Sequence, residues 1–160
     1  MKDNRTPPID SARQASLLAW LHLLRITHKI QRGETALLAE HNLTLPQFDV
    51  LAQLHHEEGI TQQTLADRLL VTKGNVCGLM ERLMEQGLVE RREDPADRRA
   101  YMLYLTPKGK QLITDILPMH RAMIAQQIGQ LTPEKQKQLL NLLSELDRAL
   151  EPYVITNAHA

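Results

Sequence analysis

Three observations predict a mainly α-helical fold that carries one small β-hairpin. Aromatic residues make up only 3% of this 160-residue chain, so its core must be built from Leu, Ile, Val and Met. Long stretches toward both ends repeat apolar residues at the three- and four-residue spacing of a helix. Between them, two strand-like segments at residues 88–93 and 100–105 flank a turn of composition Asp-Pro-Ala-Asp.

The composition is that of a globular protein with one domain. The length allows one hydrophobic core and is short for two, and 42% hydrophobic with 24% charged residues is ordinary. No apolar run approaches the roughly 18–20 residues of a membrane span, and the N-terminus lacks the apolar region of a signal peptide. The single cysteine excludes an internal disulfide. We expect a cytoplasmic protein without membrane contact.

Both ends of the chain are predicted to form dimerisation helices. The segment 11–40 has no proline, and its apolar arc is wide enough to require cover from a second chain. A further long helix follows Pro107, with a kink expected at Pro118, and the last helix starts at Pro133. The sequence therefore predicts a single domain over residues 1–160, divided into dimerisation helices at about 11–40 and 108–153 and a central lobe at about 44–107.

The central lobe is predicted to contain three short helices before the hairpin. The first begins near Pro46 and is ended by Gly59. Thr61 is expected to cap the second, whose inner face comprises Leu65, Ala66, Leu69 and Leu70. Thr72 caps the third, with Gly87 just past its end. Its inner face follows the helical spacing at Val76, Leu79, Met80, Leu83 and Met84.

The outer face of this third helix has the chemistry of a surface that enters a DNA groove. Two glycines in a helix interior cost about 1 kcal/mol each relative to alanine, which is explained if the backbone must approach another surface closely. First-turn residues of such a helix reach base edges or phosphates, where Asn pairs with adenine and Lys with guanine. The predicted DNA-contacting residues are Thr72, Lys73, Gly74, Asn75, Gly78 and, on phosphate, Arg82. The alternative is a solvated helix face.

A charged hairpin after that helix completes a winged helix-turn-helix. Arg98 and Arg99 lie at its tip beside Asp97, whose carboxylate can orient a guanidinium toward a narrow minor groove. Ordinary surface charges on a turn are the alternative. The net charge is zero, which argues against a general polyanion binder, but cations gather in one region. These cations are Arg91, Arg92, Arg98, Arg99, Lys108 and Lys110.

The chain closely resembles the MarR family of bacterial transcriptional regulators in two consecutive runs, TQQTLADRLLVTKGNVCGLMERLMEQG and LVERREDPADRRAYMLYLTPKGK. The resemblance extends over about residues 12–150. It implies a homodimer with interlocked terminal helices, bound to double-stranded DNA at a pseudo-palindromic operator with a recognition helix in each major groove. It also implies repression that is relieved by an unidentified small-molecule effector or an oxidant.

The resemblance points to an effector pocket between the dimer helices and the DNA-binding lobe. Asp49 and Arg91 resemble two positions of the urate-responsive branch, although Leu79 stands where that branch has a second arginine. Trp20, His28 and Phe48 are further candidates for the lining of this pocket.

Other chemistries have weaker support in the sequence. Cys77, one turn after Lys73, is either a redox-responsive thiol or a tolerated small residue, and the cysteine of the peroxide-sensing branch is missing from the first helix. The histidines lack metal-ligand spacing, so no metal or other cofactor is expected. A winged helix that binds protein is the alternative function, motivated by the neutral charge and by Glu81 and Glu85. We expect no enzyme, because neither a phosphate loop nor a nucleophile elbow occurs.

Overall fold

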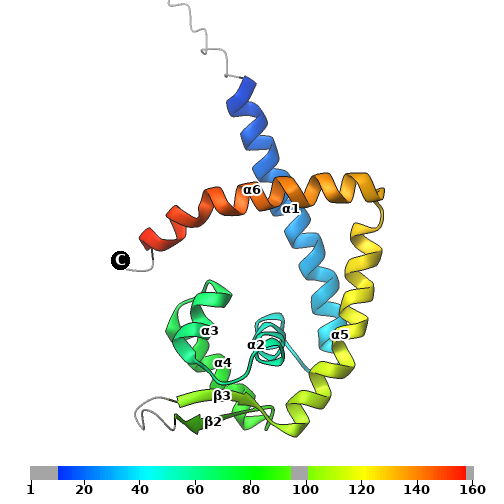
Figure 1. Cartoon of the computed structure of the whole chain (residues 1–160). Coiled ribbons are helices and arrows are strands. Elements are labelled where there is room, and N and C mark those ends of the chain that lie inside the picture. Colours follow the sequence, from blue (N-terminus) through cyan, green and yellow to red (C-terminus); the bar gives the residue numbers. More distant parts are fainter. Residues whose placement is uncertain (1–10, 95–100, 158–160) are drawn as a thin grey trace, which may run out of the picture. The chain divides into compact units, whose positions relative to one another are not determined.

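The computed structural model describes residues 11–94 and 101–157, and it confirms the mainly α-helical fold with a small β-sheet (Figure 1). None of the helices in these ranges is long and apolar enough to cross a membrane. The elements are, in order, α1 (Ser11–Ala39), α2 (Leu45–His56), β1 (Ile60–Thr61), α3 (Gln62–Leu69), α4 (Lys73–Glu85), β2 (Val89–Glu93), β3 (Tyr101–Leu105), α5 (Pro107–Ile128) and α6 (Pro133–Asn157).

The chain divides into two compact units, Met1–Leu45 and Pro46–Ala160. The first unit holds α1, a single long helix as the sequence predicts. The helix ends at Ala39, and the turn after it contains Asn42, which adopts a left-handed φ of 55° while the Leu43 amide donates to the Leu38 carbonyl at 3.1 Å. This is a Schellman-type end, in which the left-handed residue lets the following amides satisfy the last carbonyls of the helix.

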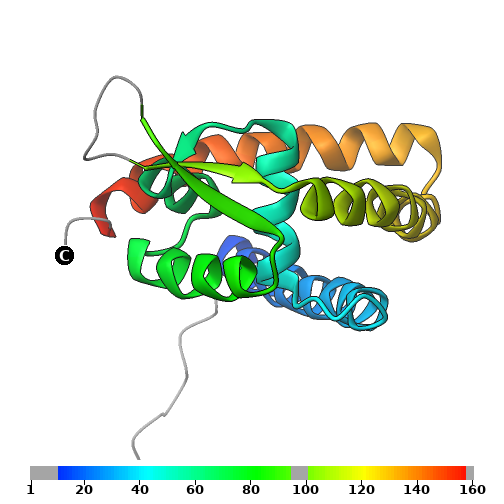
Figure 2. The ribbon, with the colours of Figure 1, turned by 90° about the horizontal axis from the view of Figure 1, so that it is seen from below.

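The second unit is organised around a three-stranded antiparallel sheet of order β1-β3-β2. Strands β2 and β3 pair from Val89 opposite Leu105 to Glu93 opposite Tyr101, as the hairpin prediction requires. Figure 2 shows β2 and β3 crossing each other in that view, next to α4. Strand β1 was not predicted, because two residues are too few to show a periodicity.

The helices of the second unit cover this sheet and one another. Helix α3 packs on α4, α4 on β2, and α5 on β3. Fully buried side chains come from every one of these helices, from α2 and from β3: Val50, Leu51, Leu54, Leu65, Ala66, Val76, Met80, Leu83, Leu103, Ile113 and Ile116. One aliphatic core therefore fixes α4 and the hairpin relative to each other.

Two details of the predicted lobe were wrong. Leu70 does not face inward: α3 ends at Leu69, and Leu70 takes a left-handed φ of 54° that leaves its side chain 74% exposed. Gly59 does not end α2, which stops at His56. With φ of 73°, Gly59 instead turns its amide to the Leu103 carbonyl at 2.9 Å and so starts the sheet.

The end of α4 is held by the beginning of α5. Gly87 has the predicted left-handed conformation, with φ of 68°, and the Leu88 amide donates to the Leu83 carbonyl. The carbonyls of three consecutive residues then accept bonds from the α5 side. Lys108 Nζ donates to Gln86, Thr106 Oγ1 to Gly87 and the Thr106 amide to Leu88, at 2.8, 2.7 and 3.1 Å. We call this set of contacts the α4–α5 joint.

The joint also explains why position 109 is a glycine. A β-carbon at Gly109 would lie 2.0 Å from the Leu88 carbonyl oxygen, a distance that no packing adjustment of a side chain can relieve because the obstacle is backbone. At Gly78, in the middle of α4, a β-carbon would meet no atom within 4 Å. The two helical glycines therefore have opposite reasons to be there: close packing at Gly109, and something other than packing at Gly78.

We expect Gly109→Ala to lower the free energy of unfolding by about 3 kcal/mol, the upper end of the cost of overpacking. Gly78→Ala is the matched control and should raise it by about 1 kcal/mol, the difference between the helix propensities of the two residues. Urea denaturation followed by circular dichroism measures both changes. Equal stability of the two variants would show that the close approach at Leu88 is unimportant.

Candidate nucleic-acid interface

Helix α4 is built so that one face is fixed and the other is free. Thr72 caps its N-terminus, with Oγ1 accepting a bond from the Asn75 amide at 3.3 Å. Val76, Met80 and Leu83 are buried on the inner side, as predicted. The other two residues of the predicted inner face, Leu79 and Met84, are half-buried.

The outer face of α4 is open along its whole length. All six of the residues singled out on this helix and its cap are exposed: Thr72, Lys73, Gly74, Asn75, Gly78 and Arg82. A β-carbon at Gly74 would meet only Thr72 Oγ1, at 3.9 Å. The two glycines thus leave a strip of bare backbone between polar side chains, and a flat surface such as a groove wall can approach it closely.

Much of the positive charge that the sequence places in this region is committed to partners within the chain. Lys108 binds the carbonyl of Gln86, and Lys110 Nζ lies 2.8 Å from Glu58 Oε2. Arg92 is paired with Glu90. The cationic cluster expected from the sequence is therefore only partly available to a ligand, because several of its members hold the fold together.

The wing strands carry a fixed arginine. Arg92 Nε donates to Glu90 Oε1 at 2.8 Å, and the guanidinium stacks over the Tyr104 ring, 4.2 Å from its centroid. Because Glu90 lies directly opposite Tyr104 in the sheet, the three side chains form one cluster on β2 and β3. The residues predicted for the wing tip, Asp97, Arg98 and Arg99, lie outside the described residues.

Glu58 ties the segment before β1 to the neighbouring strand β3 and to α5. Its carboxylate accepts the Leu105 amide at 2.8 Å through one oxygen and the Lys110 ammonium through the other. Partial burial alone would raise the pKa of Glu58, but the bonds from Lys110 and Leu105 and the nearby Arg92 charge outweigh it and bring the pKa below its ordinary value. Neither Glu58 nor the partner role of Lys108 was predicted, since both depend on contacts distant in sequence.

The residues proposed for an effector pocket fall in both units of the chain. Trp20 and His28 are exposed on α1, whereas the other three belong to the second unit. Phe48 is buried and its ring packs on His120 of α5, with the centroids 4.6 Å apart. Asp49 and Arg91 are half-buried, and the buried Nε of Arg91 has no hydrogen-bond partner among the described residues.

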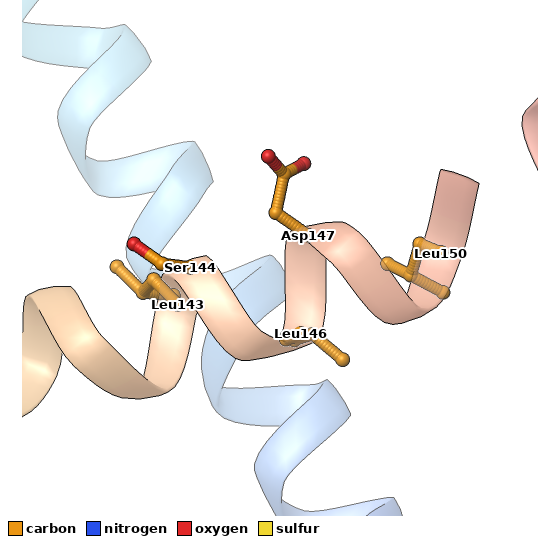
Figure 3. A pocket seen from close by; sticks show the side chains of 5 residues that line it. All are labelled: Leu143, Ser144, Leu146, Asp147 and Leu150. Carbon is orange, nitrogen blue, oxygen red and sulfur yellow. The ribbon is translucent and has the colours of Figure 1, made fainter.

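Two surface hollows each lie on a single helix. One is on α6, and Figure 3 shows Leu146 and Asp147 leaving that helix in different directions. The residues that line it are Leu143, Ser144, Leu146, Asp147 and Leu150. The other, on α1, is lined by His28, Gln31, Arg32 and Thr35. Both are open helix surfaces and not enclosed ligand sites.

Cys77 is a free thiol, half-buried on α4. Within residues 11–94 and 101–157, no group of three or more His, Cys, Asp or Glu side chains is arranged to hold a metal ion.

Comparisons with known proteins agree with this geometry. The family model described as MarR family matches residues 41–100, which include α2–α4 and β2. An HTH-type transcriptional regulator of Bacillus cereus is 30% identical over 135 residues, spanning 84% of this chain and 90% of the relative. The chain belongs to the MarR family. The Bacillus subtilis regulator YkoM is 34% identical over 66% of this chain and 69% of its own length.

A solved structure shows the same fold on DNA. The S. aureus MepR–DNA complex superposes with a TM-score of 0.77 and 25% identity, covering 82% of this chain and 98% of MepR. This MarR-family protein is thus a member of a family of helix-turn-helix transcriptional regulators, and its α3 and α4 form the helix-turn-helix.

The Glu58 contacts yield a test by pH. Because the folded-state pKa is below the unfolded one, Glu58 stabilises the fold above its ordinary pKa of about 4.3, and this stability is lost as the pH falls through the folded value. Glu58→Gln should cost roughly 1 kcal/mol at pH 7 and flatten this acid limb. The control is Glu57→Gln, whose pair with Arg68 is largely exposed and should contribute under about 0.5 kcal/mol. Urea denaturation midpoints measured between pH 3 and 7 test this prediction. Identical midpoint-against-pH profiles for wild type and Glu58→Gln would contradict the stabilising role of Glu58.

Proposed function

We propose that this protein is a homodimeric, sequence-specific regulator that binds a pseudo-palindromic operator in double-stranded DNA and represses transcription until a small-molecule effector releases it. The observation that carries the proposal is the outer face of α4, where polar side chains and bare backbone are exposed on a helix whose other face is buried. The DNA complex of the structurally similar MepR supports duplex DNA as the partner.

The residues of the α4 face have separate roles in this proposal. Lys73 and Asn75, in the first turn, read base edges in the major groove, and Thr72 caps the helix there. Gly74 and Gly78 allow the backbone to approach the groove. Arg82, two turns further along, binds phosphate.

A second contact is proposed for the wing. From the sequence, Arg98 or Arg99 enters the minor groove next to the major-groove contact, and Asp97 orients one of the two guanidinium groups. The Arg92 cluster on β2 and β3 supports the proposal, because its bonds stiffen the strands that lead to this tip.

Base-reading and phosphate-binding residues should be separable by titration. We expect Asn75→Ala to weaken operator binding by about 1–3 kcal/mol and to relax selectivity at one base pair, with the salt dependence unchanged. Arg82→Ala should weaken operator and random DNA alike and lower the salt slope by about one. Fluorescence anisotropy on duplexes selected from a random pool, at two salt concentrations, gives both quantities.

Arg121→Ala, an exposed arginine of α5, is the matched control and should bind DNA as the wild type does. Selection of no duplex by the wild-type protein would overturn the proposed function in favour of a winged helix that contacts protein.

The homodimer is supported by the exposed apolar surface of the terminal helices. Exposed large side chains follow one another along α1 and recur on α6, and a monomer would leave them in water. They are Leu17, Leu18, Trp20, Leu21, Leu23, Leu24 and Ile26 on α1, and Leu140, Leu142, Leu143, Leu146 and Leu150 on α6.

Charges on this surface should separate the protomers. Leu142 and Leu146 lie four residues apart on α6, hence on one face, and are 64% and 41% exposed in the single chain. The double variant Leu142→Glu/Leu146→Glu should sediment as a monomer, since each buried carboxylate would carry a desolvation cost of several kcal/mol. Val71→Glu, at an exposed apolar position outside these helices, is the control and should remain dimeric. A dimeric double variant would remove α6 from the interface.

The effector is proposed to be a small molecule with an anionic and an apolar part. Arg91 supports this chemistry, because its buried Nε is a donor without a hydrogen-bond partner among the described residues. Asp49, Phe48, Trp20 and His28 complete the proposed set through the resemblance to the family. Loss of anisotropy on addition of aromatic carboxylates to the operator complex is the first screen.

A further inference from the structure

The turn between α3 and α4 contains a leucine in a conformation that leucine disfavours. Leu70 has φ of 54° and ψ of 39°, in the left-handed region, where a β-carbon crowds the following carbonyl and glycine or asparagine is preferred. The geometry is that of a regular helix end. The Leu70 amide donates to the Asp67 backbone carbonyl at 3.2 Å, and the Val71 amide donates to the Ala66 carbonyl at 3.0 Å. The helix therefore needs a left-handed residue here but does not need a leucine.

The Leu70 side chain is exposed, so burial does not offset the strain of its backbone. At 74%, Leu70 is the most exposed of the large apolar side chains in the described residues, and the adjacent Val71 is 39% exposed. Exposure of a leucine loses the hydrophobic stabilisation that burial would give. Backbone strain and an unburied side chain at the same residue indicate a contact outside the protomer.

The position of Leu70 identifies the partner. It stands two residues before Thr72, the cap of α4, and so at the end of the helix that is proposed to read bases. Lys73, Gly74 and Asn75 continue the exposed surface on the other side of that cap. An apolar side chain at this end of a helix in the major groove meets two apolar groups of DNA, the thymine 5-methyl group and the deoxyribose face.

We infer that Leu70 is a contact residue of the DNA interface, which packs its exposed side chain on one of these apolar groups. The inference rests on the proposed DNA-binding function. It differs from the polar readout by Lys73 and Asn75 in that it carries no charge and no hydrogen bond, so its contribution to binding is independent of salt.

Leu70→Asn is the central variant, because asparagine tolerates the left-handed conformation and is polar. We expect it to be at least as stable as the wild type in urea and to bind the selected operator about fivefold more weakly, the loss of roughly one apolar contact. The salt slope should stay the same. Leu70→Met, which keeps an unbranched β-carbon and an apolar tip, should retain affinity within about twofold.

The matched control is the other left-handed helix end. Asn42 has φ of 55° and the same hydrogen-bond pattern, but lies in the first unit, outside the helix-turn-helix. Asn42→Leu creates there the combination found at position 70. It should lower stability and leave operator affinity unchanged in the folded protein.

Operators in which single thymines are replaced by uracil distinguish the two DNA groups. If Leu70 contacts a methyl group, one such replacement weakens the wild type and has no further effect on Leu70→Asn. If it contacts deoxyribose, Leu70→Asn is weaker by the same factor on every operator. Undiminished operator binding by a folded Leu70→Asn variant would overturn the inference about Leu70 and leave the proposed DNA-binding function unaffected. Failure of the wild type to select any duplex would overturn it together with the proposed function.

Discussion

The α4–α5 joint is the constraint on which the placement of α4 and of the hairpin strands depends. Three successive carbonyls, at residues 86–88, accept bonds from Thr106 and Lys108, and the absence of a side chain at Gly109 lets α5 begin directly against Leu88. The carbonyls at a helix C-terminus have no partner within the helix and carry its negative dipole end, so the Lys108 ammonium satisfies both needs at once. The joint therefore holds the end of α4, the start of β2 and the end of β3 next to one another.

A chain of zero net charge can still present positive charge to a ligand, because some of its cations are paired within the chain and others are exposed. Three cations of the basic region in the sequence have partners within the chain, whereas two cations of α4, outside that region, are exposed. Lys108, Lys110 and Arg92 are internal partners of a carbonyl and two carboxylates. Lys73 and Arg82 stay exposed on α4. Electrostatic attraction to phosphate depends on where exposed cations lie, and for this reason the sum of charges says little about function.

The sequence was sufficient to predict every helix of residues 11–94 and 101–157 and the pairing of the two hairpin strands, because these follow from local signals. Thr72 and Thr106 each cap a helix through their own hydroxyl, and Gly87 takes the left-handed φ that its position demands. The same local signals placed the exposed face of α4 correctly. Strand β1, by contrast, has two residues and is defined by its pairing with Leu103 and Met102 of β3.

Contacts between distant segments were not predictable in this way. Glu58 lies 47 residues from the Leu105 amide whose hydrogen bond it accepts. The residues next to Glu58 in the sequence give no signal of this contact. Leu70 was mistaken for a core residue because its spacing from Leu65, Ala66 and Leu69 continues a helical stripe. The helix ends one residue earlier, and the change to a left-handed φ turns the side chain outward. A stripe predicts burial only as far as the helix that carries it.

Two unfavourable local choices lie in α4 and in the turn that precedes it. Gly78 lowers the helix propensity of α4 without any packing need, and Leu70 combines a disfavoured backbone conformation with exposure of an apolar side chain. The opposite side of α4 shows none of this: Val76, Met80 and Leu83 are fully buried at regular helical spacing. At most positions the local preference of a residue matches the structure that it adopts, and the exceptions are expected at functional sites. The departures here lie on the exposed face and N-terminal approach of one helix, the surface proposed to bind DNA.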